Sequence, residues 1–254
     1  MTRIIAIANR KGGTGKTTVA INLGAALAEQ GKRVLLVDLD EQANCTSGVG
    51  IDEATNGHFR TVADVLITPE TDPAELIRET GFPNLSIIPS SNALRGVNEK
   101  LAEIVGAELL LKDALSKVHG YDFIFLDCPP AVNRLTTNAL VAAQQVLVPI
   151  QTGKWALDGT QELFRTMQGV RARLNPSLEV IGVVLTFYDP RTSLSREILR
   201  LLEEQFQQRL FRTHIRTATK IGESTLAHLP VLAYASRSDA AQGFRDLASE
   251  FLQR

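Results

Sequence analysis

A strand, a glycine-rich turn and a helix follow one another at the start of the chain, and this order limits the possible folds more than any other feature. The apolar run at residues 4–8 predicts the strand, and the turn reads NRKGGTGKTT over residues 9–18. A helical pattern covers residues 16–30 and ends at Gly31. Backbone N–H groups at such a turn and the positive end of the helix dipole attract anions, and glycines let phosphate oxygens approach the backbone. The order therefore predicts a phosphate-binding loop.

This loop carries two lysines and no acidic residue. In a phosphate-binding loop, Lys16 reaches the β and γ phosphates and Thr17 binds Mg²⁺ through its hydroxyl. Lys11 is additional, and Arg10 stands where the usual G-x-x-x-x-G-K-[ST] pattern has its first glycine. Two ammonium groups ~4 Å apart repel each other by about 1 kcal/mol in water and by more in a drier site, so the pair indicates a pocket that a polyanion fills. The predicted nucleotide-binding residues are Lys11, Gly12, Gly13, Thr14, Gly15, Lys16, Thr17 and Thr18.

Apolar runs alternate with helical patterns along the rest of the chain. Further strands are predicted at residues 34–37, 85–88, 123–126, 146–150 and 180–187, and a weaker one at 210–215. Helices are predicted at residues 94–118, 135–144, 156–174, 195–208 and 240–252, and one or two short helices over a sheet edge within the irregular stretch 53–81. Strands that are apolar on both faces and joined by helices predict an α/β fold, with a doubly wound, mostly parallel sheet and helices on both faces. We expect one domain over residues 1–254.

Three aspartates follow or end predicted strands. Asp38 and Asp40 lie two apart in VLLVDLDEQAN, and their carboxylates share one face if the extended chain continues that far. Asp127 ends a strand in YDFIFLDCPP. Each alone also fits a helix N-cap or turn, but together they mark the ligand crevice at the carboxyl ends of parallel strands. We predict Thr17, Asp38 and Asp127 as the metal ligands, Asp127 in the manner of a Walker-B aspartate. Asp40 would orient the attacking water, which makes Lys11, Lys16 and Asp40 the predicted catalytic residues.

The motifs KGGTGKTT, DLDEQAN and LDCPP, in this order, resemble the ParA/MinD group of deviant Walker A ATPases of the P-loop NTPase class. The stretches VPIQTGKWALDG and FYDPRTSLSREI resemble the short Soj-like ParA partition ATPases. The resemblance implies a homodimer of ATP-bound subunits with Mg²⁺, in which Lys11 reaches the partner's phosphates in trans. It also implies a weak basal ATPase, stimulated by DNA and a ParB-like adaptor protein. Such a protein is cytoplasmic and nucleoid-associated, and it partitions plasmid or chromosome DNA.

Basic residues gather in one part of a chain whose formal net charge is only −1. Residues 189–220 hold seven Arg or Lys against four acidic residues. The family binds double-stranded DNA non-specifically through basic residues in this region, and Arg191 and Lys220 match such positions. The predicted DNA-binding residues are Arg191, Lys220, Arg196 and Arg216. Solvated helix faces explain Arg200 and Arg209 equally well.

Two segments depart from the family pattern. Residues 215–218 read Ile-Arg-Thr-Ala where the family has Ile-Pro-Arg-Asn, and Gly153-Lys154-Trp155 replaces a common aromatic. We therefore assign no adenine-contacting residue. The guanine motif Asn-Lys-x-Asp is absent, which disfavours GTP. No helix-turn-helix precedes the first predicted strand, so we expect no operator-specific DNA binding.

Three alternatives remain open. A MinD-like membrane-cycling ATPase would need an amphipathic helix, but the polar face of residues 240–252 is mixed rather than rich in Lys or Arg, so we expect a core helix and no stable membrane association. A metabolic enzyme on the same fold, such as a nitrogenase-iron-protein relative or an amide-forming synthetase, is a second alternative. Cys45 and Cys128 lack metal-ligand spacing, which disfavours a cluster. The third is the same ATPase cycle positioning a cargo other than DNA.

Overall fold

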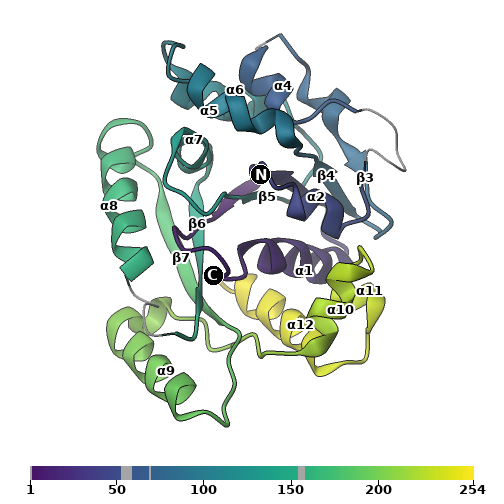
Figure 1. The fold of residues 1–254 in the computed structure, drawn as a ribbon, viewed down its shortest axis with the longest axis vertical. Helices are drawn as coiled ribbons and strands as arrows, with labels where there is room; N and C mark the ends of the chain where they lie inside the picture. The colour runs from purple at the N-terminus through teal and green to yellow at the C-terminus, as the bar shows by residue number, and fades with distance from the viewer. Residues whose placement is uncertain (1, 53–58, 69, 154–157) are drawn as a thin grey trace.

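The computed structural model describes residues 2–52, 59–68, 70–153 and 158–254. Its centre is a seven-stranded sheet in the order β3-β4-β2-β5-β1-β6-β7 (Figure 1). All neighbouring strands are parallel except β3, which pairs antiparallel with β4 at one edge. The strands are β1 (Arg3–Ile7), β2 (Val34–Asp38), β3 (Arg78–Glu79), β4 (Leu85–Ile88), β5 (Phe123–Asp127), β6 (Gln145–Gln151) and β7 (Glu179–Thr186). The predicted fold class is confirmed.

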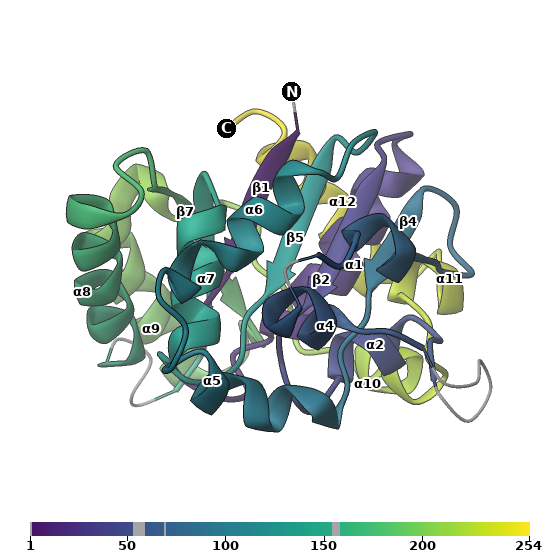
Figure 2. The same cartoon turned by 90° about the horizontal axis from the view of Figure 1, so that it is seen from above.

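Helices cover both faces of this sheet, as the view from above shows (Figure 2). One face carries α1 (Lys16–Glu29), α2 (Asn44–Gly48), α10 (Thr219–Leu226), α11 (Val231–Tyr234) and α12 (Asp239–Phe251). The other carries α4 (Val62–Ile67), α5 (Val97–Lys100), α6 (Leu110–Ser116), α7 (Arg134–Ala142), α8 (Asp158–Arg173) and α9 (Ser193–Phe206). Along β2, Leu35 and Val37 enter one core and Val34 and Leu36 enter the other. This alternation explains why the strands read as continuous apolar runs.

Helix α12 is a core helix, as its pattern predicts. Phe244, Leu247 and Phe251 are fully buried, and the Phe251 ring lies 5.6 Å and 5.8 Å from the rings of Phe123 and Phe125. The apolar face of α12 is therefore occupied by the sheet. Within the described ranges, no helix is both long and apolar enough to cross a membrane.

Two predicted elements differ from the structure, whereas the short helices expected within the irregular stretch are present. The helix predicted at residues 94–118 is wrong, because the chain breaks into η2 (Asn92–Gly96), α5, η3 (Ala107–Leu109) and α6, with Gly106 in the left-handed region at φ +74°. The weak strand at 210–215 is wrong, since this segment forms one isolated bridge, Val183 to Leu210, and a second bridge, Tyr188 to Arg216, lies just beyond it. The irregular stretch contains α4, η1 (Pro73–Leu76) and the short β3, while residues 53–58 and 69 lie outside the described part. The helix predicted at 156–174 is described as α8 from Asp158 on.

Parallel pairing brings the carboxyl ends of three strands together. Asp127 at the end of β5 is in register with Ile7 of β1 on one side and with Asp38 of β2 on the other. The glycine-rich loop leaves β1 at this edge and enters α1. The predicted phosphate loop and the predicted aspartates therefore meet at one place.

Candidate nucleotide site

The loop between β1 and α1 borders a cavity of about 400 Å³. Gly13 and Gly15 have φ of +73° and +80°, a region that other residues rarely adopt, and Gly15 is the N-cap of α1. The ring of Phe187 packs so closely that a Cβ at Gly15 would lie 3.3 Å from its Cε2 atom. Glycine lets the loop adopt this shape without strain at these positions. The N-terminus of α1 borders the cavity.

Several hydrogen bonds from neighbouring strands hold the loop. The Asn9 side chain donates to the Pro149 carbonyl at 2.7 Å and accepts from the Lys11 N–H at 3.2 Å. The Thr186 hydroxyl donates to the Thr14 carbonyl at 2.8 Å. Arg10, at the position of the missing first glycine, forms an ion pair with Glu162 of α8. The loop is therefore attached to β6, β7 and α8.

The two lysines differ in their surroundings. Lys16 is 6% exposed, and its Nζ donates to the Lys11 carbonyl at 3.2 Å. Burial lowers the pKa of Lys16, an effect that the nearby Asp127 opposes. Lys11 is half-buried, with its Nζ close to Gly153, and no carboxylate in the described residues forms an ion pair with it. Among the side chains that the structure describes, Lys11 is thus a cation at a phosphate loop without an acidic partner.

The two aspartates of DLDEQAN do not share a face. Strand β2 ends at Asp38, so the extended chain does not continue to Asp40, and that prediction is wrong. Asp40 lines the cavity, whereas Asp38 is fully buried and accepts three hydrogen bonds, from the Asp40 N–H and from the N–H and hydroxyl of Thr46. Burial raises the pKa of Asp38 to about 6, although these hydrogen bonds act in the opposite direction.

Both carboxylate oxygens of Asp127 lack a hydrogen-bond donor among the described residues. Asp127 is 1% exposed, and no donor in residues 2–52, 59–68, 70–153 or 158–254 forms a hydrogen bond with either carboxylate oxygen. Burial and the neighbouring Asp38 raise its pKa well above the usual range, while Thr17 and Lys16 lie near enough to oppose the shift. A buried, unpartnered carboxylate beside a threonine hydroxyl is a set of donors that Mg²⁺ accepts together with phosphate oxygens. The residues fit the metal, and they favour Asp127 over Asp38 as its ligand.

In the described ranges, side chains of the protein do not form a complete metal site by themselves. The described ranges hold no group of three or more His, Cys, Asp or Glu side chains that could bind one. Mg²⁺ at a phosphate site needs only one or two protein ligands, because phosphates and waters complete its shell. Both cysteines, Cys45 and Cys128, are buried and free. The donor set therefore suits Mg²⁺ bound with a nucleotide.

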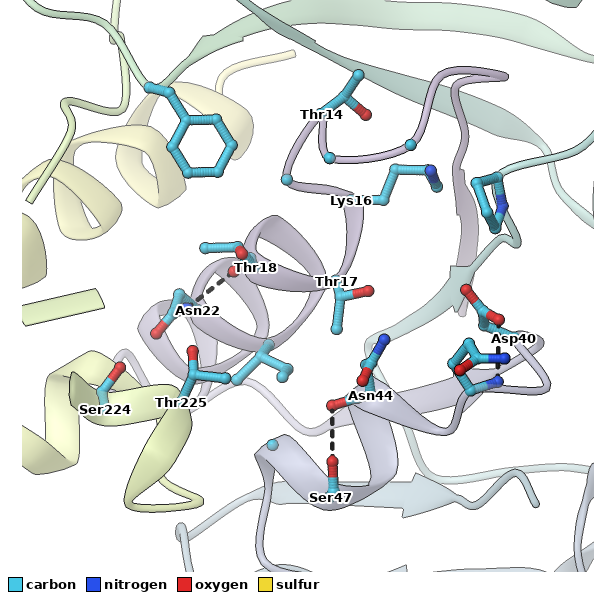
Figure 3. Close-up of a pocket in the computed structure, with 18 of the residues that line it drawn as sticks. Thr14, Lys16, Thr17, Thr18, Asn22, Asp40, Asn44, Ser47, Ser224 and Thr225 are labelled. Carbon is cyan, nitrogen blue, oxygen red and sulfur yellow. Dashed lines mark hydrogen bonds between the residues drawn. The ribbon is translucent and has the colours of Figure 1, made fainter. Parts of the chain in front are cut away.

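Other residues around the cavity have no signal in the sequence. Figure 3 shows Ser224 and Thr225 of α10 beside the first turns of α1, near Asn22, and Asn44 and Ser47 of α2 below Thr17. Asn22 connects α1 to the start of α11, since its side chain donates to the Thr18 carbonyl at 2.8 Å and accepts from the Val231 N–H at 2.7 Å. Residues 215–218, which depart from the family pattern, line a separate cavity of about 570 Å³. In the second segment that departs from this pattern, Lys154 and Trp155 lie outside the described residues.

The predicted DNA-binding residues are exposed but are not gathered in one cluster. Arg191 precedes α9 and Arg196 lies on it, whereas Lys220 lies on α10, and α9 and α10 are apart in both views (Figures 1 and 2). The Arg196 guanidinium donates to the Pro190 carbonyl at 2.7 Å. Arg216 is exposed beside the second cavity.

Two of these cations have acidic partners. The Arg191 guanidinium donates to both carboxylate oxygens of Asp189, at 2.9 Å and 2.8 Å, and this contact lowers the pKa of Asp189 to about 2. Lys220 forms a 2.7 Å ion pair with Glu223. Any anion that binds Arg191 or Lys220 must therefore compete with a carboxylate of the chain itself.

Comparisons with known proteins agree with this geometry. A family model described as an AAA domain matches residues 2–180. The sporulation initiation inhibitor protein Soj of Bacillus subtilis is 40% identical over 251 residues, covering 98% of each chain. The chromosome partitioning protein ParA of Caulobacter vibrioides is 41% identical over 257 residues, covering 99% of this chain and 94% of that one. A solved structure of cobyrinic acid a,c-diamide synthase from Mycobacterium smegmatis, with bound ADP and magnesium, is similar with a TM-score of 0.86 and 34% identity, covering 100% and 95% of the two chains.

Proposed function

Because the chain belongs to the ParA/MinD family of partition ATPases, we propose that it is an ATPase that dimerises when it binds ATP and Mg²⁺. In this proposal the dimer binds double-stranded DNA non-specifically and partitions plasmid or chromosome DNA with a ParB-like adaptor. The protein acts in the cytoplasm, associated with the nucleoid, and residues 1–254 work as one domain. DNA and the adaptor together stimulate a slow basal hydrolysis.

The observation that carries the proposal is Lys11. Lys16 is in the position that contacts the phosphates within one subunit, so a second lysine at the same loop repels it unless more negative charge is present. Lys11 has no carboxylate partner in the described ranges. A facing subunit with its own bound triphosphate supplies that charge. Lys11 then stabilises both the dimer and the transition state of the partner's hydrolysis, as an arginine finger does.

The remaining residues divide the chemistry between them. The loop N–H groups and Lys16 hold the phosphates, and Thr17 and Asp127 hold the metal, which neutralises phosphate charge when bound. Asp40 accepts a hydrogen bond from the attacking water and orients it toward the terminal phosphate. Only Asp40 among the three aspartates borders the cavity, which supports its separate role.

DNA binding follows from the exposed cations. Contacts to phosphates alone give dissociation constants of about 10⁻⁴–10⁻⁶ M and a steep dependence on salt. A dimer presents Arg191, Lys220, Arg196 and Arg216 twice, so ATP-driven dimerisation raises DNA affinity without new contacts in each subunit. This connection lets hydrolysis release the protein from DNA.

The test is the oligomeric state with a hydrolysis-resistant ATP analogue and Mg²⁺, measured by analytical ultracentrifugation. We expect the wild-type protein and Lys117→Ala, a matched control at an exposed lysine, to form dimers. Lys11→Ala is expected to bind the analogue and remain monomeric, and the analogue-bound wild-type dimer is expected to bind DNA. A monomeric wild-type protein, or a Lys11→Ala variant that dimerises normally, contradicts the proposal.

A second candidate is an amide-forming synthetase, because the similar M. smegmatis structure bears that name. Such an enzyme uses ATP to activate a carboxylate for attack by ammonia or glutamine nitrogen. The two candidates differ in what raises ATP turnover. We expect DNA with adaptor to raise it and glutamine to have no effect; stimulation by glutamine and a carboxylic acid substrate would favour the synthetase.

A further inference from the structure

Hydrogen bonds hold the two peptide groups on either side of the Asp40 Cα atom. The Asp40 N–H donates to the Asp38 carboxylate at 3.1 Å, and the Asp40 carbonyl accepts from the Ser90 hydroxyl at 2.7 Å. One oxygen of the Asp40 side chain also accepts from the Gln42 N–H at 3.0 Å, a contact drawn in Figure 3. The second carboxylate oxygen is left for another donor. The backbone and one oxygen of Asp40 are therefore fixed at the wall of the cavity.

A single side chain, Thr46, joins the two anchors. Its hydroxyl donates to the Asp38 carboxylate at 2.7 Å and accepts from the Ser90 N–H at 2.9 Å, and its own N–H donates to Asp38 at 2.9 Å. The result is a closed ring of four residues, Asp38, Asp40, Ser90 and Thr46, which we call the Asp40 clamp. Asp38, Thr46 and Ser90 are 0%, 3% and 2% exposed, so water does not compete for these hydrogen bonds.

Apart from the clamp, the segment after Asp40 is held by a local turn, in which the Ala43 N–H donates to the Asp40 carbonyl at 3.0 Å, and by a 3.8 Å ion pair between Glu41 and Arg95. Residues 41–43 lie partly or fully exposed between β2 and α2, and Ala43 has a left-handed φ of +51°. A left-handed alanine is strained and persists only where surrounding contacts enforce it. Ser90 lies two residues after the end of β4 and is 50 residues away from Asp40 in the sequence. The clamp thus connects a short exposed turn to two buried strand ends.

We propose that Thr46 and Ser90 are positioning residues for ATP hydrolysis, which hold the Asp40 carboxylate where it can orient the attacking water. This inference rests on the proposed ATPase function. Groups that act in catalysis must be held within about 0.5 Å of the productive geometry, and a displacement near 1 Å costs about 100-fold in rate. Neither Thr46 nor Ser90 lies in the phosphate loop, so their effect falls on hydrolysis rather than on nucleotide binding.

The experiment compares Ser90→Ala and Thr46→Val, which remove the hydroxyls, with Thr46→Ser, which keeps one. Ser91→Ala is the matched control, because that neighbouring hydroxyl accepts from the Ala93 N–H and does not contact the clamp. Single-turnover hydrolysis of ATP measures the rate without an adaptor. Binding of a hydrolysis-resistant analogue and the thermal midpoint are measured on the same proteins.

We expect Ser90→Ala to hydrolyse ATP about 10-fold more slowly and Thr46→Val about 10- to 100-fold more slowly, with analogue affinity within twofold of wild type. Thr46→Ser and Ser91→Ala are expected to stay within threefold of the wild-type rate. If Thr46→Val does not fold, Ser90→Ala alone decides.

Three results overturn the inference: Ser90→Ala at the wild-type rate, Ser91→Ala equally slow, or analogue affinity lost in parallel with the rate. A further variant, Asp40→Asn, separates this inference from the proposed function. If Asp40→Asn is slow while Ser90→Ala is not, only the inference fails. If the wild-type protein does not hydrolyse ATP, the proposed function fails first.

Discussion

Replacing Gly15 with alanine tests the geometry of the phosphate loop directly. Alanine at φ +80° costs about 1–2 kcal/mol, because its Cβ crowds the following carbonyl oxygen. The new methyl group would also lie 3.3 Å from Phe187 Cε2 and 3.6 Å from Thr186 Cβ, so the Phe187 ring must move. Overpacking of this kind costs roughly 1–3 kcal/mol. We therefore expect Gly15→Ala to lower the free energy of unfolding by about 2–5 kcal/mol.

Gly31 provides a control with the same backbone strain and no new contact. Its φ is +79°, and a Cβ there would have no other atom within 4 Å. Gly31→Ala should therefore lose only about 1–2 kcal/mol, or about 2–8 °C in thermal midpoint for a chain of this size. The difference between the two variants isolates the cost of displacing Phe187.

Urea unfolding measures the free energy of unfolding of each variant. The increase in that free energy when nucleotide is added measures whether the variant still binds nucleotide. An ATP analogue with Mg²⁺ at 100 times its dissociation constant adds about 2.7 kcal/mol to a protein that binds it. We expect this gain in wild type and in Gly31→Ala, and a smaller one in Gly15→Ala, because the methyl group displaces the Phe187 ring, which lines the same cavity. Equal stability of the two variants together with an equal gain from the analogue would refute the geometry described for the loop.

Two further predictions concern charge. Arg191→Ala should reduce the slope of log affinity against log salt for DNA by about 2 per dimer, because one phosphate contact is lost in each subunit. Glu223→Gln should raise DNA affinity, because it releases Lys220 from its ion pair. Fluorescence anisotropy over a salt series measures both effects, and no change in either variant would remove both cations from the interface. Burial lowers the pKa of His214 in the folded protein, so the unfolded chain binds a proton more readily and stability falls as the pH drops below about 6.5, by at most about 1.4 kcal/mol per pH unit. The raised pKa values of Asp38 and Asp127 act in the opposite direction over this range, so the contribution of His214 is measured as a difference between variants. In urea unfolding between about pH 7.5 and about pH 5, the exposed control His119→Asn should follow the wild-type pH dependence, whereas His214→Asn should be more stable relative to wild type at about pH 5 than at about pH 7.5.

The parts of the fold that follow from apolar periodicity are predictable from the sequence. Strands such as β2 and β5 are buried on both faces, so their composition alone identifies them. The two-residue β3 has no such pattern, because its pairing depends on where the chain turns after η1. Gly106 also reads as an ordinary residue within a helical pattern, yet its positive φ ends one helical segment and starts another. The local sequence pattern does not predict these features, because they depend on tertiary contacts.

Some residues of the candidate site are likewise predictable from the sequence, and others are not. Lys16, Thr17 and Asp127 are found from motif and strand position, because their chemistry depends on local geometry that the motif itself specifies. Thr46 and Ser90 are ordinary polar residues in the sequence, and their significance arises from hydrogen bonds to residues 8 to 50 positions away. Asp38 was predicted to face the metal, but those same contacts occupy its carboxylate. The spacing of residues in the sequence does not predict such long-range hydrogen bonds.

The segment after β7 connects the phosphate loop to the basic region through very few residues. Thr186 donates to the Thr14 carbonyl and Phe187 packs on Gly15, while the next residue, Tyr188, exchanges backbone hydrogen bonds with Ile215 and Thr217. Phe187 has a left-handed φ of +51°, a conformation that persists because its neighbours enforce it. Coupling between nucleotide and DNA requires contacts that differ between the two states. In the proposed cycle, a loop movement on loss of the terminal phosphate would reach Phe187 first. Phe187 is four residues from Arg191, and its neighbour Tyr188 is hydrogen-bonded to the segment that carries Arg216.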